Sequence, residues 1–313
     1  MIKKTDKIFV AGHKGLVGSA IVRKLRLKGF KKILTVDKKK LNLINQDAVL
    51  SFLKKEKPKC IFLAAAKVGG IYSNNKYKAE YIYENLMIQT NIIHSAHIAR
   101  IKNIIFLGSS CIYPKLSKQP IKEKYFLSGK LEETNDAYAV AKIAGVKMCE
   151  SYNSQYNANF KCLMPTNTFG PNDNYNELNS HFVPALLKKI SKIEKNNSNK
   201  IKIWGDGSPK REIIYADDIA DACIFFMNKK VKHTLINIGT GKDLKIKEYV
   251  KLFLKILLPK RKIKIIYDKS KPNGTPRKVL DVSLAKKYGW SAKTSIKDAI
   301  IKTYKEYKIR QNI

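Results

Sequence analysis

The chain has 313 residues, of which 44% are hydrophobic and 10% are aromatic. This usage is that of a folded globular protein, and it excludes a wholly disordered or collagen-like chain. At about 150 residues per domain, the length predicts roughly two domains.

The formal net charge is +37, and the chain has 55 Lys but only 7 Arg. A strong positive charge is one sign of a nucleic-acid or membrane partner. Recognition of bases and phosphates favours the planar Arg side chain, however, and the lysines are spread along the whole sequence. We therefore interpret most lysines as solvated and expect no nucleic acid and no membrane partner. The alternative is a functional basic face, which would also attract an anionic small substrate.

The five cysteines form no C-x-x-C pair and are too sparse for a disulfide framework, which favours a reducing compartment. The longest apolar stretches, such as 60–66, are much shorter than the about 20 residues of a membrane span. The N-terminal sequence also lacks the apolar region of a secretory signal. We expect a cytoplasmic protein.

Apolar runs in the first half predict buried strands at 7–11, 33–37, 60–66 and 104–108, with helical segments between them. Continuous apolarity without alternation is typical of a parallel sheet that is covered on both faces. The pattern predicts an α/β fold with a doubly wound parallel sheet, of the Rossmann type. A further strand is expected at 159–164; Pro165 ends it before a loop at 166–179 that is rich in Asn, Gly and Pro.

The second half predicts a helix at 181–195, a strand at 200–204, a turn at 205–209 and a helix opened by Asp217 and Asp218. The polar run 195–200 is expected to be exposed, and 236–239 are expected to return to the first sheet as a strand. We therefore expect a cofactor-binding domain at 1–170, with a return segment near 212–240. A smaller α/β substrate domain is expected at 171–313.

Gly12, Gly15 and Gly18 have G-x-x-G-x-x-G spacing between a predicted strand and a helix predicted at 16–27. Glycines permit a tight turn and let backbone N–H groups approach a pyrophosphate at the helix N-terminus. We interpret this segment as a dinucleotide-binding loop. The alternative is an ordinary strand-to-helix turn.

Charges near this loop bear on the choice of dinucleotide. Asp37 ends the second predicted strand, where an acidic residue can accept from a ribose 2′-hydroxyl. Lys38, Lys39 and Lys40 follow directly, and Lys14 lies within the glycine loop. Because cations suit a 2′-phosphate, we expect NADPH rather than NADH.

Tyr138 and Lys142 form a Y-x-x-x-K motif, which places both on one face of a helix predicted at 136–152. An ammonium group beside a phenol favours the phenolate, so we expect Lys142 to lower the pKa of Tyr138. Ser109 follows the strand 104–108, at the sheet edge where open α/β sheets bind ligands. Around a nicotinamide, these three groups suit hydride transfer to or from a carbon that bears oxygen. The alternatives are a turn Ser and a surface Tyr–Lys pair.

The glycine loop, Ser109 and the Y-x-x-x-K motif resemble the extended short-chain dehydrogenase/reductases that act on nucleotide sugars, over nearly the whole chain. Further segments narrow the resemblance to the GDP-L-fucose synthase family: AAAKVGGI (64–71), GSSCIYPK (108–115), PTNTFGPNDNY (165–175), SHFVPALL (180–187), WGDGSPKRE (204–212) and KPNGTPRK (271–278).

The resemblance implies a bifunctional 3,5-epimerase and 4-reductase that acts on GDP-4-keto-6-deoxy-D-mannose with NADPH, and a homodimer. It implies Cys111 as the base and His181 as the acid of epimerisation. Ser109 and Tyr138 would hold the ketone oxygen, which Tyr138 protonates during reduction. Related 4,6-dehydratases carry an acidic pair after the Ser, whereas this chain has Cys111 and Ile112. Taken singly, Cys111 could be a small buried residue and His181 a helix cap.

The resemblance also assigns binding residues. Those for the cofactor are Gly12, His13, Lys14, Gly15, Leu16, Val17, Gly18, Lys38, Ala64, Ala65, Leu107, Gly108, Ser109, Ser110, Tyr138, Lys142, Pro165, Thr166, Asn167, Thr168 and His181. Those for the substrate are Ser109, Ser110, Cys111, Tyr138, Asn167, His181, Lys189, Trp204, Arg211 and Lys278. We expect no metal site, and Trp204 could instead fill the core of the smaller domain.

Some positions depart from the family pattern. Lys189 and Lys38 stand where Arg is usual, and Asn273 stands where Asp is usual. Thr168 and Phe169 replace the more usual Leu-Tyr. These departures bear on the exact sugar and on cofactor preference. Two alternatives stay open: a GDP-sugar 4-ketoreductase with a different product, and a non-catalytic basic Rossmann protein that binds nucleic acid through its lysines.

Overall fold

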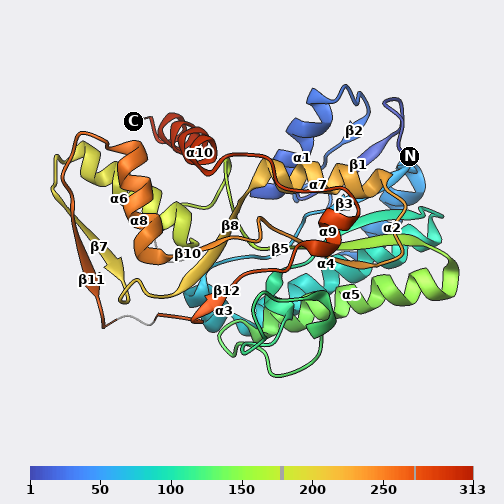
Figure 1. The fold of residues 1–313 in the computed structure, drawn as a ribbon. Helices are drawn as coiled ribbons and strands as arrows, with labels where there is room; N and C mark the ends of the chain where they lie inside the picture. The colour runs from blue at the N-terminus through green and yellow to red at the C-terminus, as the bar shows by residue number, and fades with distance from the viewer. Residues whose placement is uncertain (177–179, 271–272, 313) are drawn as a thin grey trace.

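A computed structural model describes residues 1–176, 180–270 and 273–312, and shows a larger region around one sheet and a smaller region around two shorter sheets (Figure 1). Residues 177–179 of the loop expected at 166–179 lie outside the described residues, as do 271 and 272 of the segment 271–278. Within the described ranges, every helix is too short or too polar to cross a membrane.

The larger region is built on a parallel sheet with the strand order β2-β1-β3-β4-β5-β9. This arrangement confirms the predicted doubly wound sheet, including the return of the strand expected at 236–239. β2 is shorter than predicted and lies at the sheet edge, where it pairs with β1 alone. The strands are β1 (Ile8–Ala11), β2 (Ile33–Leu34), β3 (Cys60–Leu63), β4 (Asn103–Leu107), β5 (Asn159–Pro165) and β9 (Leu235–Ile238).

Helices cover both faces of this sheet, which explains why its strands are apolar on both sides (Figure 1). Along β1, Val10 belongs to the core under α1 (Leu16–Leu27) and α7 (Ala216–Asn228). Its neighbour Phe9 belongs to the opposite core, under α2 (Gln46–Glu56), α4 (Lys78–Ile98) and α5 (Asp136–Tyr156). Two short helices, α3 (Ile71–Lys76) and α9 (Ser283–Lys287), complete the larger region.

The smaller region is centred on β8 (Lys210–Tyr215). This strand pairs with β6 (Asn167–Phe169), β10 (Asp243–Lys245) and β12 (Arg277–Lys278), while β7 (Lys200–Trp204) pairs with β11 (Lys264–Asp268). Three helices, α6 (Phe182–Lys195), α8 (Ile246–Leu257) and α10 (Ile296–Arg310), pack on a separate core that includes Leu187, Phe253 and Tyr304.

The prediction of a loop at 166–179 is wrong at 167–169, because these residues form β6 against β8. The partner strand lies more than forty positions away, so local composition does not reveal the pairing. The predicted helix at 181–195 begins one residue later, with His181 in the N-cap position.

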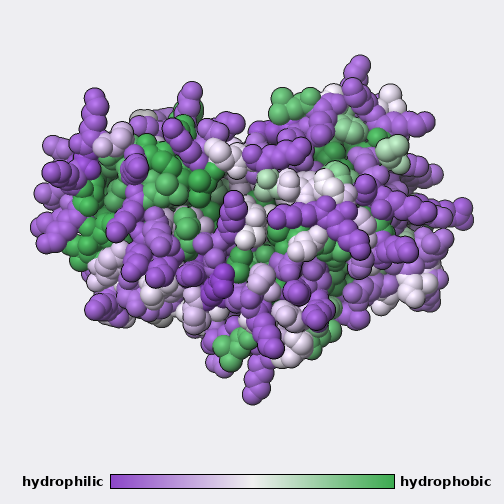
Figure 2. All heavy atoms as spheres, in the orientation of Figure 1, coloured by the Kyte–Doolittle hydropathy of each residue, from purple (hydrophilic) through white to green (hydrophobic). Residues whose placement is uncertain are grey.

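Hydrophilic side chains cover both regions on the face drawn in Figure 2, while apolar side chains gather over the part that holds α6 and α8. The hydrophilic surface in this view is not confined to one patch, as expected if most lysines are solvated.

Candidate active site

The glycine loop joins β1 to α1 and has little room for side chains. Gly12 has a φ of +85°, and a Cβ there would lie 2.6 Å from the backbone nitrogen of Ala65. A Cβ on Gly18 would lie 2.1 Å from the carbonyl oxygen of Gly12. Gly15 is the N-cap of α1 and provides no side-chain cap. The loop therefore leaves the first N–H groups of α1 without a side-chain acceptor, as a phosphate site requires.

Cations gather at the end of β2, beside this loop. Lys14 Nζ lies 2.8 Å and His13 Nε2 3.2 Å from the same carboxylate oxygen of Asp37. The hydrogen bond from Lys14 is the largest cause that lowers the pKa of Asp37. Lys38 Nζ lies 3.8 Å from Glu84, and the side chains of Lys14 and Lys38 are both about three-quarters exposed. The carboxylate that could otherwise accept from a ribose hydroxyl is thus already held by two neighbouring side chains.

The end of β4 brings Ser109, Tyr138 and Lys142 together. Lys142 is 3% exposed, and its Nζ donates to the carbonyl of Leu107 at 2.9 Å. The same Nζ lies 5.8 Å from the centre of the Tyr138 ring. The backbone N–H of Cys111 donates to Ser109 Oγ at 3.2 Å, which orients that hydroxyl.

The expectation that Lys142 lowers the pKa of Tyr138 is wrong for this structure. Burial raises the pKa of Tyr138, and a hydrogen bond with Ser109 only partly opposes that effect. Lys142 is directed at the Leu107 carbonyl, and burial lowers its own pKa to about 8. Tyr138 therefore stays protonated at neutral pH and is prepared to donate a proton.

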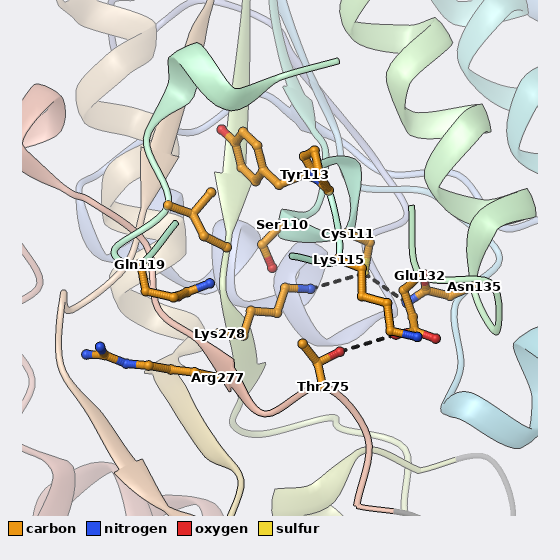
Figure 3. Close-up of a pocket in the computed structure, with 12 residues that line it drawn as sticks. Ser110, Cys111, Tyr113, Lys115, Gln119, Glu132, Asn135, Thr275, Arg277 and Lys278 are labelled. Atoms are coloured by element: carbon orange, nitrogen blue, oxygen red, sulfur yellow. Dashed lines mark hydrogen bonds and ion pairs between the residues drawn. The ribbon is translucent and has the colours of Figure 1, made fainter. Parts of the chain in front are cut away.

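Cys111 is half-buried and lies in a small pocket that Figure 3 shows. Asn135 Nδ2 donates to its sulfur at 3.4 Å, and Lys278 Nζ donates at 3.5 Å. Lys278 is 167 positions away in the chain and comes from β12 of the smaller region. An ammonium and an amide N–H at these distances stabilise negative charge on the sulfur.

The rest of the pocket beside Cys111 is mostly polar. Lys115 Nζ lies 3.1 Å from Glu132, whose carboxylate also accepts from Thr275 Oγ1 at 3.5 Å (Figure 3). Ser110 is buried and lines the same pocket. These contacts join β12 and the residues before it to the loop between η1 (Ser110–Ile112) and α5.

His181 lies at the N-cap of α6, but its side chain makes no capping hydrogen bond. The residue is exposed, yet surrounding protein atoms lower its pKa, and the charge of Lys278 acts in the same direction. Lys278 therefore lies within electrostatic range of both His181 and Cys111. One cation therefore contacts Cys111 and acts on the pKa of His181, although the two residues come from different regions.

Packing and hydrogen bonds restrict the backbone where β4 and β5 end. A Cβ on Gly108 would lie 2.1 Å from the Met164 side chain. Asn167 Nδ2 and Thr166 Oγ1 both donate to the carbonyl of Glu212, at 2.8 Å and 3.3 Å. Thr168 Oγ1 donates to the Thr166 carbonyl at 3.0 Å. Remaining residues assigned to the cofactor flank the same strand ends or the glycine loop: Leu16, Val17, Ala64, Ala65, Leu107 and Pro165.

The residues expected to bind the nucleotide lie in the smaller region. Lys189 Nζ donates to the Lys202 carbonyl at 2.8 Å and lies 5.9 Å from the centre of the Trp204 ring. Trp204 is 55% exposed, which contradicts the alternative that it fills the core. Arg211 lies on β8, where burial lowers its pKa and where it pairs with Lys278 of β12.

Asn135 was missed because its sequence position suggests an ordinary role. It directly precedes α5, where Asn is a common capping residue. Its side chain makes no cap and contacts Cys111 instead, and its buried Oδ1 has no hydrogen-bond partner. Glu132 and Glu212 were also missed. Glu212 ends the segment 204–212 that carries the family resemblance, but a local pattern does not show which distant residues contact either carboxylate.

A model of the NAD dependent epimerase/dehydratase family matches residues 8–239. The putative GDP-L-fucose synthase 2 of Arabidopsis thaliana is 48% identical over 307 residues, which cover 98% of this chain and 93% of that protein. The GDP-L-fucose synthase of Escherichia coli K12 is 44% identical, with 96% of this chain and 95% of that protein covered. Among solved structures, MlghC, a GDP-mannoheptose C4 reductase from Campylobacter jejuni with NADP bound, has a TM-score of 0.89 and 37% identity, with 98% of this chain and all of that chain covered.

Proposed function

The chain belongs to the NAD dependent epimerase/dehydratase family, and we propose that it converts GDP-4-keto-6-deoxy-D-mannose to GDP-L-fucose. The conversion needs inversion at C3 and C5 and reduction of the C4 ketone. The observation that carries this proposal is the sulfur of Cys111, held between Asn135 and Lys278 beside Ser109 and Tyr138.

Epimerisation uses Cys111 and His181. The C4 ketone makes the hydrogens on C3 and C5 acidic, so a thiolate can remove them as protons. Lys278 stabilises that thiolate electrostatically. Ser109 and Tyr138 donate hydrogen bonds to the enolate oxygen that forms at C4. His181 gives a proton to the opposite face of the ring, which inverts the carbon, and its lowered pKa makes the imidazolium a stronger acid. Solvent then takes the proton from Cys111 and returns one to His181 before the second carbon reacts.

Reduction uses Tyr138 as the acid. NADPH, when bound, supplies the hydride that reduces the ketone. Because burial keeps Tyr138 protonated, its hydroxyl gives a proton to the C4 oxygen as negative charge develops there. The ammonium of Lys142 then lies near the phenolate that remains and offsets its charge.

The glycine loop fits a dinucleotide phosphate. The uncapped first turn of α1 would hold the pyrophosphate. Lys14 and Lys38 are exposed cations beside the end of β2, where a 2′-phosphate would lie. His13 belongs to the same group through its contact with Asp37. These charges support NADPH as the cofactor.

The diphosphate of the nucleotide would bind Lys189 and Arg211, and the exposed face of Trp204 would stack against guanine or sugar.

We place the division between the two domains near residue 170, with 212–240 returning to the larger one. We also propose that the protein is cytoplasmic and that it forms a homodimer. Light scattering of the purified protein tests the dimer, and a monomer at micromolar concentration would contradict it.

Purified protein, GDP-4-keto-6-deoxy-D-mannose and NADPH provide the direct test. We expect oxidation of NADPH and a product with the NMR couplings of GDP-L-fucose. No NADPH oxidation with this ketone would refute the proposal. A reduced sugar with C3 and C5 uninverted would identify a 4-ketoreductase without epimerase activity.

A further inference from the structure

A fully buried carboxylate connects the parts of the site that come from the smaller region. Glu212 is 0% exposed and lies next to Arg211 on β8. Its Oε1 accepts from the backbone N–H groups of Thr240 and Gly241, at 2.5 Å and 2.7 Å. Its Oε2 accepts from the backbone N–H of Leu280 at 2.8 Å. Burial raises the pKa of Glu212, and the hydrogen bonds from these backbone N–H groups oppose that effect; together they make the side chain a rigid anchor.

The Leu280 bond matters because Lys278 lies two residues earlier. β12 is only two residues long, and Lys278 pairs with Arg211 at the end of that short ladder. The hydrogen bond between Glu212 and Leu280 extends the attachment of this segment to β8 beyond the last strand pair. The position from which Lys278 reaches Cys111 is therefore fixed by β8 on both sides of the residue.

The backbone of Glu212 holds another part of the site. Its carbonyl accepts from Asn167 Nδ2 and Thr166 Oγ1, which lie where β5 passes into β6. One residue thus connects the strand ends of the larger region, the segment of Lys278, and Arg211. Gly239 is required beside it, since a Cβ there would lie 2.2 Å from the carboxylate.

We propose that Glu212 is a positioning residue for epimerisation, which holds Lys278 at the sulfur of Cys111 through the Leu280 N–H. This inference rests on the proposed function. Glu212 does not touch the sulfur itself, so its effect passes through Lys278. Loss of this anchor should weaken proton removal by Cys111 more than reduction, since Tyr138 and Lys142 come from α5 and Ser109 follows β4 in the larger region.

The test is Glu212→Gln, which replaces one acceptor oxygen with an amide donor. Whichever way the amide turns, Thr240 and Gly241 or Leu280 lose an acceptor. We expect the ratio of inverted to uninverted product to fall about tenfold, since small misplacement near reacting groups is costly. The matched control is Asp218→Asn, which alters another buried carboxylate that holds the backbone of Lys293 and Thr294, away from Cys111. This control should leave the product ratio unchanged.

A double-mutant cycle separates positioning from general loss of structure. In a Lys278→Met background, adding Glu212→Gln should change the product ratio by less than twofold, because both changes remove one interaction. Two outcomes would overturn the inference. The effects of the two substitutions on the product ratio could multiply, or Glu212→Gln alone could leave the product ratio unchanged. If that variant does not fold, Glu212→Asp replaces it, since its shorter carboxylate cannot reach all the donors. Wild-type protein that inverts no carbon would refute the proposed function itself and is thus a distinguishable outcome.

Discussion

The two halves of the candidate active site are assembled in different ways. Ser109, Tyr138 and Lys142 lie within one stretch of the larger region: Ser109 follows β4, and the other two are on α5. Cys111 belongs to the same stretch, but Lys278 and His181 come from the smaller region. The group that we propose for reduction is therefore set by one sheet and one helix, whereas the group proposed for epimerisation depends on how β12 and α6 meet that sheet.

This difference predicts that substitutions can separate the two proposed chemistries. Lys142 is anchored by the carbonyl of Leu107 and is 3% exposed. Lys278 reaches Cys111 at 3.5 Å from a strand of two residues. Changes in the smaller region should therefore alter epimerisation first, and changes on α5 should alter reduction first.

The largest expected effect comes from Cys111→Ser. A serine hydroxyl is a far weaker base than a thiolate, so proton exchange at C3 and C5 should fall about a thousandfold. Reduction of the ketone should remain measurable, and NADPH oxidation read beside deuterium exchange distinguishes the two. Equal loss of both activities would contradict the separate role assigned to the sulfur.

Tyr138→Phe should mainly slow reduction, by about a hundredfold, because no group then gives a proton to the C4 oxygen. Exchange at C3 and C5 should fall less, since Ser109 still donates to the enolate oxygen. The measurement is single-turnover NADPH oxidation, with circular dichroism as the control for folding. A reduction rate equal to wild type would show that another residue is the acid.

The pH dependence of reduction tests the environment of Lys142. Burial lowers the pKa of this amine to about 8, so its charge is present below that pH and lost above it. The value of kcat/KM for reduction should fall up to about tenfold per pH unit on the alkaline side. In Lys142→Arg the guanidinium stays charged, so the alkaline fall in kcat/KM should move to higher pH. If this fall stays at the same pH, another group causes it.

The smallest effect is expected from Lys14→Ala, which removes one exposed cation beside the end of β2. The dissociation constant for NADPH should rise about threefold to tenfold, and that for NADH should change less. Lys31→Ala, an exposed lysine before β2, is the matched control. Equal weakening of both cofactors would argue against a contact with the 2′-phosphate.

Local patterns predicted the parts of the structure that depend on neighbouring residues. The apolar runs predicted the parallel sheet, and the spacing of Tyr138 and Lys142 placed them on one helix face. The pKa of Tyr138 was predicted in the wrong direction, because spacing shows that a lysine is near but not how deeply the phenol is buried.

Contacts between distant segments could not be predicted from patterns. β6 forms only because β8 is beside it. The contact between Lys278 and Cys111 joins residues that are 167 positions apart in the chain. Asn135 directly precedes α5, a position typical of a helix cap, and only the folded chain shows that its amide donates to the sulfur. The family resemblance supplied roles for Cys111 and His181 that their local sequence does not.

Exchange of hydrogen for deuterium tests the central claim most directly. GDP-4-keto-6-deoxy-D-mannose is incubated with the protein in D₂O before NADPH is added, and the sugar is followed by NMR. We predict that wild-type protein places deuterium at both C3 and C5, and that Cys111→Ser places almost none. Reduction of the ketone by wild-type protein without deuterium at either carbon would contradict the account.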